Sequence, residues 1–231
     1  MCLIISISTT SYSGPVEVKV PGNLELAYYG KEATLFYSEP LYKVRVANKI
    51  LYVIPGVSQP SIYSIWFLEH TTIYEGEDVL DLGTGTGVHG IFAAEKARKV
   101  VSSDISELSV ENVKLNTKLH EVDNIIEARQ GDLLRTLKND EQFDVILFTV
   151  GLPDRKEKQG SWELHERFFR NVDKHLKPHG RIYYLSSFVD NIPHLQSMIE
   201  KNHFQIIKLD MVAAVKRKRE PIVIMIQRKT E

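Results

Sequence analysis

Short apolar runs alternate along most of the chain with stretches in which apolar residues recur every three or four positions. The first pattern is typical of strands buried in a sheet and the second of amphipathic helices. Strands are predicted over residues 79–82, 99–104, 125–130, 144–148, 181–185, 204–212 and 221–227. Helices are predicted over residues 62–72 and 163–176, around residues 195–199, and in two further stretches that begin at residue 88 and at Ser106. In the helix that begins at Ser106, the buried positions are expected to be Leu108, Leu115 and Leu119. Strands that alternate with helices predict a doubly wound α/β sheet of mostly parallel strands.

The N-terminal part has a different pattern, in which apolar and polar residues alternate over short distances. Residues 16–26 alternate in this way on both sides of a Pro-Gly-Asn break, which predicts strand, turn and strand. A second hairpin is predicted over 44–53, with its turn at Asn48 and the lysine after it. We therefore expect residues 1–60 to form a small β-rich extension, either a cap or an added part of the sheet. Residues 61–231 would form the main domain.

Composition and charge limit what the chain can do. A chain of 231 residues, 43% of them hydrophobic, has room for one large domain with a substantial core. The net charge of −1 gives no overall field that attracts nucleic acid, although a local patch still can. The single cysteine, Cys2, excludes an intramolecular disulfide, and no metal site is expected. The apolar residues 1–7 are too short for a membrane span and lack the basic start of a signal peptide, so we expect a cytoplasmic protein.

The most informative stretch follows the first predicted strand of the main domain. Asp81 comes just before Gly83, Gly85 and Gly87, which fall on alternate positions at the start of a helix. Glycine permits positive φ and a close approach of ligand to main chain, and the first turn of a helix has free N–H groups. The part from Gly85 to Gly90 also matches G-x-G-x-x-G, the fingerprint that seats a dinucleotide pyrophosphate. Asp81 disfavours that ligand, because a carboxylate repels a pyrophosphate and attracts an ammonium or sulfonium cation.

Two further carboxylates follow the next two strands. Asp104 ends the strand 99–104, where a carboxylate can accept hydrogen bonds from both hydroxyls of a ribose. Asp132 comes directly after the strand 125–130 and one glycine. In this order and spacing, the glycine motif and the acids resemble the class I S-adenosylmethionine-dependent methyltransferases. The resemblance implies that Asp81 lies near the methionine end of the cofactor, that the glycines pack against it and that Asp132 holds the adenine amino group. Ile105 is assigned to the same site.

Within that class the chain resembles the branch of the release-factor glutamine methyltransferases and the small-subunit ribosomal guanine methyltransferases, the methyltransferase small domain. As in that branch, a proline-containing loop at 55–61 and a helix precede the glycine motif, and the resemblance extends over about residues 44–190. It implies a seven-stranded Rossmann-like sheet with an antiparallel last strand. It also implies S-adenosyl-L-methionine as the cofactor and S-adenosyl-L-homocysteine as the product.

The chain departs from that branch in the loop after the fourth strand. Related amide and base methylators have Asn-Pro-Pro there, and the asparagine and a proline carbonyl hold the planar acceptor nitrogen. Here the corresponding residues are Thr149-Val150-Gly151-Leu152. A threonine hydroxyl can orient an acceptor but lacks the paired donor and acceptor of an amide. We expect Thr149 to be the catalytic residue on the acceptor side and to border the cofactor, and the departure weakens the case for a glutamine or base amino acceptor.

Several other residues are candidates for the chemistry. Methyl transfer depends mainly on alignment and desolvation of the nucleophile, and a general base helps only when the acceptor loses a proton. His89 and His165 are candidates for that base, with a surface or helix-capping role as the alternative. Trp162 and Phe168–Phe169 are candidates for an acceptor pocket, with core packing as the alternative for the phenylalanines.

A local basic run stands after the sixth predicted strand: Lys216, Arg217, Lys218 and Arg219. Because that strand is predicted to be parallel to the others, its end lies at the edge of the sheet that holds the cofactor. A basic turn there can bind RNA phosphates or an acidic partner protein, and the alternative is a solvated turn.

Together these patterns predict S-adenosylmethionine-dependent methyl transfer, with a nitrogen of a protein or RNA as the preferred acceptor. A small-molecule N- or O-methyltransferase is the alternative within the same class. Two other classes stay open: a nicotinamide-dependent oxidoreductase that uses Gly85 to Gly90, and a binding module that holds the cofactor without catalysis.

Overall fold

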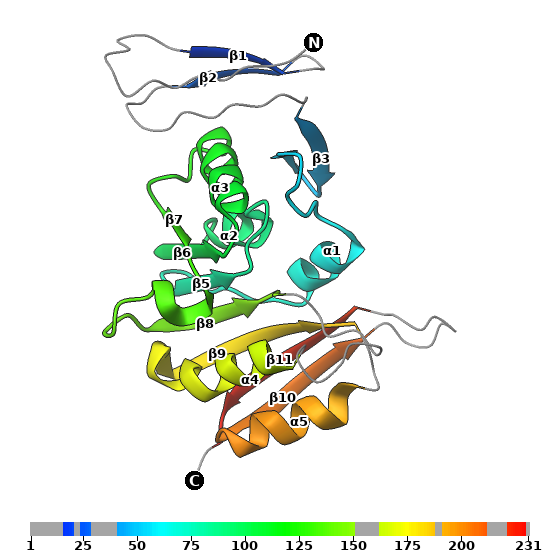
Figure 1. The fold of residues 1–231 in the computed structure, drawn as a ribbon, viewed down its shortest axis with the longest axis vertical. Coiled ribbons are helices and arrows are strands. Elements are labelled where there is room, and N and C mark those ends of the chain that lie inside the picture. Colours follow the sequence, from blue (N-terminus) through cyan, green and yellow to red (C-terminus); the bar gives the residue numbers. More distant parts are fainter. Residues whose placement is uncertain are drawn as a thin grey trace.

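A seven-stranded sheet lies at the centre of the computed structural model (Figure 1), which describes residues 16–20, 24–28, 41–150, 162–187, 191–211 and 221–229. The strand order is β10-β11-β9-β8-β5-β6-β7. In chain order the strands are β5 (Asp78–Leu82), β6 (Lys99–Asp104), β7 (Ile126–Gln130), β8 (Phe143–Phe148), β9 (Leu176–Ser186), β10 (Phe204–Met211) and β11 (Ile222–Arg228). Strand β11 runs antiparallel to the other six strands of this sheet, which are parallel to one another. The predicted doubly wound sheet with an antiparallel last strand is confirmed.

Helices cover both faces of the sheet (Figure 1). One face carries α1 (Ile62–Glu69), α2 (Val88–Ala93) and α3 (Glu107–Leu119), and the other carries α4 (Glu163–Asn171) and α5 (Ile192–Lys201). Successive residues of a strand point to opposite faces, so each strand feeds two cores. In β8, Ile146 and Phe148 belong to the core with α4 and α5, whereas Val145 and Leu147 belong to the core with α1, α2 and α3.

Helix α3 begins where the sequence predicts, but it buries a different face. The Ser106 hydroxyl accepts a hydrogen bond from the Ser109 N–H at 3.4 Å, so Ser106 is the N-cap. Leu115 is buried as expected, but Leu108 is 45% exposed, and Leu119 is only half-buried. The inward face also holds polar residues that apolar periodicity does not reveal, among them two asparagines.

Helix α4 is shorter than predicted. It ends at Asn171, a 3-10 turn covers Val172–His175, and β9 begins at Leu176. The pairing jumps from Phe143 with Leu176 to Val145 with Arg181, so residues 177–180 form a bulge inside β9 rather than a helix stop. Strand pairing at Leu176 therefore replaces the last predicted turn of the helix.

Both predicted N-terminal hairpins are present. Strand β1 (Val16–Val20) pairs with β2 (Leu24–Tyr28), and β3 (Tyr42–Val46) pairs with β4 (Lys49–Val53), each antiparallel. The turn of the second hairpin is at Ala47-Asn48, one residue earlier than predicted, with Ala47 at a φ of 49°. Leu51, in the middle of β4, lies in the core that also holds residues of α3. A domain boundary between residues 60 and 61 stays a prediction.

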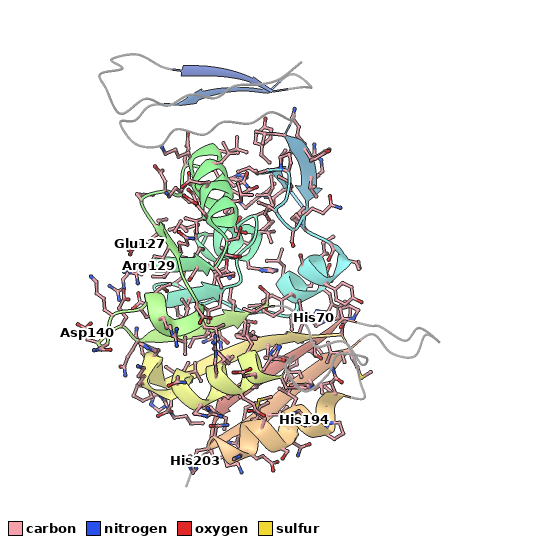
Figure 2. All side chains as sticks on the ribbon, in the orientation of Figure 1. His70, Glu127, Arg129, Asp140, His194 and His203 are labelled. Atoms are coloured by element: carbon pink, nitrogen blue, oxygen red, sulfur yellow. The ribbon has the colours of Figure 1, made fainter. Side chains whose placement is uncertain are left out.

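Ion pairs fix the edge of the sheet at β7. Arg129 donates to both Glu127 and Glu141, and Figure 2 shows Glu127 and Arg129 beside each other at this edge. The hydrogen bonds from Arg129 are the main reason that the pKa of Glu141 falls to about 2. Within the described ranges, the structure contains no helix long and apolar enough to cross a membrane.

Candidate functional site

A small cleft of about 70 Å³ lies where β5, β6 and β8 end. It brings together four residues that the sequence assigns to the cofactor: Gly83, Asp104, Ile105 and Asp132. The carboxyl ends of parallel strands are where ligands bind in open α/β sheets. The position of the cleft therefore agrees with the position predicted for the cofactor site.

Asp104 is held in place by the main chain on both sides of it. One carboxylate oxygen accepts a hydrogen bond from the Gly85 N–H at 3.0 Å, and the other accepts one from the Ser106 N–H at 3.0 Å. The side chain is half-buried and lines the cleft. A carboxylate has about four acceptor positions, so roughly two stay available for hydroxyl donors. This geometry suits a carboxylate that accepts from a diol.

The glycine turn lies against the strand ends because its residues have no side chains. Gly83 has a φ of +74°, and a Cβ atom there would lie 2.8 Å from the Val150 side chain. Gly85 and Gly87 also have positive φ, 54° and 82°, and Gly87 is the N-cap of α2. The carbonyl of Ser58 lies 3.5 Å from where a Cβ of Gly85 would stand, so the loop before α1 passes beside the turn. All three positions therefore have the positive φ that the sequence analysis expects of glycine there.

Asp81 is buried beneath the glycine turn. Its side chain is 0% exposed, and one carboxylate oxygen accepts hydrogen bonds from the Thr84 hydroxyl at 2.6 Å and the Gly90 N–H at 3.1 Å. Burial, the largest effect, raises the pKa of Asp81 to about 6. The other carboxylate oxygen is buried and has no hydrogen-bond partner among the described residues, so the predicted position of Asp81 near the methionine end of the cofactor stays a prediction. Asp81 also holds the glycine turn in shape.

Gly90, which the sequence assigns only to the alternative dinucleotide fingerprint, supports the site, as do Asn112 and Asn116, which the sequence analysis does not name. A Cβ at Gly90 would lie 2.5 Å from the Ser102 hydroxyl, so glycine there lets α2 approach β6. Asn116 donates to the carbonyl of Thr86 inside the glycine turn at 2.9 Å. Asn112 accepts from the Ile54 N–H at 2.7 Å. Two asparagines four residues apart in a predicted helix are the sequence signal that points to such a role.

Asp132 lies in the cleft but is paired with arginines. One oxygen accepts from Arg167 of α4 at 2.5 Å, and Arg135 lies 3.7 Å from the other. Beside it, Ile105 is 70% exposed and lines the cleft together with Leu164. An exposed apolar side chain at a cleft gives a flat ligand a surface to pack on. The cleft thus combines an apolar wall with a carboxylate held by α4.

Thr149 joins the ends of two strands. Its hydroxyl donates toward the carbonyls of Leu82 and Gly83, each at 3.3 Å, and its N–H donates to Leu82 at 3.2 Å. Only its oxygen lone pairs are left for an acceptor molecule. Its assignment as the catalytic residue stays a prediction. The loop residues Gly151 to Asp154 and the basic run Lys216 to Arg219 lie outside the described residues.

The two candidate bases are buried. His165 is fully buried, and its Nδ1 lies 2.8 Å from the Tyr184 hydroxyl, whose pKa is raised by burial. His89 is 5% exposed, its ring lies 4.9 Å from that of Phe67, and burial lowers its pKa to about 4. Neither histidine lies on the surface, and neither lines the cleft at Asp104. Phe168 and Phe169 are core residues, which is the alternative that the sequence left open.

The comparison with known families identifies the chain. Residues 63–215, more than half of the chain, match the methyltransferase small domain. A putative protein N5-glutamine methyltransferase of Methanocaldococcus jannaschii is 33% identical over 148 residues, which are 58% of this chain and 73% of that protein. The chain therefore belongs to the methyltransferase small domain family. This confirms the family resemblance, and with it S-adenosylmethionine as the cofactor.

Other relatives share a smaller part of their length. The ribosomal protein L11 methyltransferase of Anoxybacillus flavithermus is 36% identical over 96 residues, which are 41% of this chain and 30% of that protein. The chain thus spans about a third of the L11 methyltransferases that it matches.

Solved structures agree on the fold. A ribosomal protein L11 methylase from Lactobacillus delbrueckii gives a TM-score of 0.60 at 23% identity, covering 77% of this chain and 84% of that one. TYW2 of M. jannaschii, solved in complex with AdoMet, gives 0.61 at 16% identity, covering 89% and 91%. At these identities the likeness shows the fold alone.

Proposed function

We propose that the chain is a cytoplasmic methyltransferase that transfers a methyl group from S-adenosylmethionine to a nitrogen atom of a protein or an RNA. The observation that carries this proposal is the position of Asp104, whose carboxylate is held by two main-chain N–H groups at the end of β6 and lines the cleft. The cofactor, when bound, supplies a methyl group already activated on a sulfonium. The protein therefore has to bind, align and desolvate the acceptor.

The residues of the cleft fit the cofactor. Asp104 is placed to accept the ribose hydroxyls, and Ile105 gives the adenine an apolar surface. We assign the adenine amino group to Asp132, and the contact of one of its oxygens with Arg167 supports this assignment by fixing the carboxylate at the cleft. The glycine turn removes side chains that would block the approach of a ligand to the main chain. Asp81 supports this turn through one carboxylate oxygen, and its other, unpaired oxygen is the group we assign to the methionine end of the cofactor.

The choice of a protein or RNA acceptor rests on the relatives. Their names describe methylation of ribosomal protein L11 and of protein glutamine, and a structural neighbour is a tRNA methyltransferase. We place the acceptor beside Thr149 and the basic run Lys216, Arg217, Lys218 and Arg219, with residues 1–60 as a cap that covers the cofactor or holds the acceptor. Replacing the four basic residues by alanine should weaken acceptor binding and its salt dependence. Unchanged, salt-insensitive affinity would remove the basic run from the acceptor site.

Thr149 favours a second candidate function. Its hydroxyl hydrogen points toward the carbonyls of Leu82 and Gly83, and a threonine has no amide to hold a planar carboxamide. A small-molecule N- or O-methyltransferase is therefore the second candidate. The two differ in the product that carries the methyl group.

Calorimetric titration tests the cofactor. We expect the wild-type chain to bind S-adenosylhomocysteine at micromolar concentration, about −8 kcal/mol. Asp104→Asn should weaken binding at least tenfold, while Asp123→Asn, the same change at an exposed site, should not. If the chain binds NAD but neither S-adenosylmethionine nor S-adenosylhomocysteine, the methyltransferase proposal is overturned in favour of an oxidoreductase.

Transfer of tritium from labelled S-adenosylmethionine tests the acceptor. The chain is incubated with unfractionated cellular protein, RNA and small molecules. If the label precipitates and protease releases it, the acceptor is a protein. If the label precipitates and ribonuclease releases it, the acceptor is an RNA. Label found only in small molecules supports the second candidate. Cofactor binding without any label would leave a non-catalytic binding module.

A further inference from the structure

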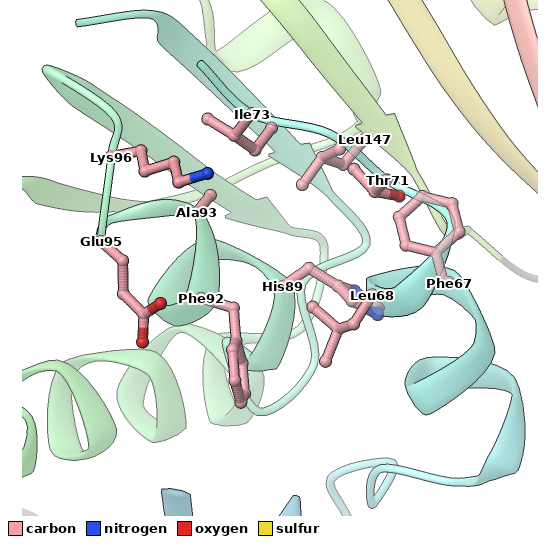
Figure 3. Close-up of a pocket in the computed structure, with 10 residues that line it drawn as sticks. All are labelled: Phe67, Leu68, Thr71, Ile73, His89, Phe92, Ala93, Glu95, Lys96 and Leu147. Atoms are coloured by element: carbon pink, nitrogen blue, oxygen red, sulfur yellow. The ribbon is translucent and has the colours of Figure 1, made fainter. Parts of the chain in front are cut away.

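A second cavity lies between α1 and α2, on the face of the sheet opposite to α4 and α5. Its volume is about 180 Å³, and its lining residues come from residues 67–73, 89–96 and Leu147 of β8 (Figure 3). It shares no lining residue with the cleft at Asp104. The walls are mainly apolar side chains: Phe67, Leu68, Ile73, Phe92, Ala93 and Leu147. The cavity is thus separate from the cofactor site.

Two polar side chains in this lining have buried atoms that make no well-formed hydrogen bond among the described residues. They are the hydroxyl of Thr71 and the ring of His89, although the Ser64 main chain lies close enough to one ring nitrogen to oppose the fall in the pKa of His89 and leaves the other nitrogen open. Buried polar atoms are nearly always hydrogen-bonded, because an unpaired one costs about 1–3 kcal/mol. His89 is more than nine-tenths buried, and Figure 3 draws its ring among the cavity residues beside Leu68. These groups are available to a guest in the cavity.

The polar and charged groups of the lining limit the kind of molecule that the cavity can bind. Burial keeps His89 neutral, so one ring nitrogen donates and the other accepts. The Thr71 hydroxyl can do either. At the rim, the carboxylate of Glu95 is paired with Lys49 at 2.8 Å, and Lys96 adds a cation close by. Opposite charges at the rim and none in the interior favour a neutral guest.

Size limits the guest further. Pockets for drug-sized ligands measure about 300–1,000 Å³, and one water takes about 30 Å³. A cavity of about 180 Å³ holds more than one water but less than a drug-sized molecule. We propose that this cavity is a binding site for a neutral, planar, single-ring molecule that carries a hydrogen-bond donor and acceptor side by side, as a lactam does. His89 and Thr71 recognise its polar edge, and the apolar walls hold its ring. The site is independent of the proposed methyl transfer.

NMR titration with 2-pyridone, a one-ring lactam, tests the proposal. The ring signals of His89 are followed in the full chain with saturating S-adenosylhomocysteine, so that the cofactor cleft is occupied. We expect saturable shifts at His89. His89→Phe and Thr71→Val should each weaken binding about tenfold, and Ala93→Leu should abolish it by filling the cavity. His179→Phe, an exposed histidine outside this cavity, is the matched control and should bind like wild type.

The outcomes separate the possible explanations. Thr71→Val removes an unpaired hydroxyl without changing the shape, so it should keep or raise the stability of the free protein. It therefore stays informative if His89→Phe fails to fold. No saturable shift at His89 would overturn the proposal and leave a cavity filled by water. Binding that Ala93→Leu leaves unchanged, or that appears only without S-adenosylhomocysteine, would overturn it by placing the probe elsewhere.

Discussion

The side-chain amide of Asn116 donates to the main-chain carbonyl of Thr86 at 2.9 Å and so joins helix α3 to the glycine turn. The same amide donates to the carbonyl of Tyr52 at 2.9 Å, and its oxygen accepts from the Tyr52 N–H at 2.8 Å. One buried side chain thus connects the strand β4, the helix α3 and the glycine turn. The shape of the turn depends on this connection.

Asn116→Leu should destabilise the fold by about 2 to 6 kcal/mol. The change leaves the Tyr52 N–H and the Thr86 carbonyl buried and unpaired, at roughly 1–3 kcal/mol each. The Tyr52 carbonyl keeps its bond from Asn112. Urea unfolding measures the loss. The control is Lys114→Ala on the same helix, which removes only a partly exposed pair with Glu111 and should cost less than about 1 kcal/mol. Equal midpoints for both variants would contradict this role of Asn116.

Gly90→Ala should destabilise the fold by about 1–3 kcal/mol, because the new methyl group would stand 2.5 Å from the Ser102 hydroxyl. Adding Ser102→Ala should recover part of the loss, since it removes the atom that clashes. A double-mutant cycle measures this coupling, which should exceed about 0.5 kcal/mol. Gly76→Ala is the comparison: its φ of +80° makes alanine strained, but nothing lies within 4 Å. Its cost should therefore be independent of Ser102.

Arg167→Met should weaken S-adenosylhomocysteine binding by about three- to tenfold. Without the arginine, the Asp132 carboxylate is free to rotate and loses its alignment toward the cleft. Calorimetry measures the change. Arg170→Met is the matched control on the same helix, because Arg170 is exposed and pairs only with Glu166 at 3.7 Å in the described structure. If both variants bind like wild type, Asp132 does not need Arg167 for its position.

The stability of wild type relative to His89→Phe should depend on pH. Burial lowers the pKa of His89 to about 4 from 6.5, so its contribution is fully present above pH 6.5 and is lost as pH falls toward 4. The loss amounts to about 3 kcal/mol. Phenylalanine binds no proton, so the difference in unfolding free energy should move by about this amount in favour of the variant between pH 7 and pH 4.

The difference in unfolding free energy between wild type and His89→Phe is the quantity to measure, because the contribution of Asp81 to stability depends on pH in the opposite direction. Its pKa is raised to about 6, so its contribution is present below pH 3.8 and is lost as pH rises through 6. The two slopes largely oppose each other in the wild-type profile. Urea unfolding of wild type and His89→Phe at several pH values cancels the part due to Asp81. A difference that stays constant with pH would show that His89 titrates normally.

The order of strands and helices, the glycine turn and the carboxylate Asp104 could be predicted from the sequence. Each of them depends on a local property of the chain. The spacing of apolar residues predicts the strands and helices, the glycines permit positive φ, and the acid stands at the end of a predicted strand. The end of α4 could not be predicted, because pairing of Leu176 with Phe143 competes with the last turn of the helix. That competition involves residues far apart in the chain.

The sequence by itself determined which residues come to the ends of the strands. Tertiary structure alone decided which of them face the cleft. Asp104 and Asp81 lie near the ends of neighbouring strands and look alike in the sequence, yet Asp104 lines the cleft while Asp81 is hydrogen-bonded to Thr84, Gly90 and Ser102. The buried pair Asn112 and Asn116 was likewise hidden, because a polar residue on a helix is read as solvated until its partners are known. Hydrogen bonds set these roles, within the glycine turn for Asp81 and to distant segments for the asparagines, whose spacing of four residues is the only local sign of their role.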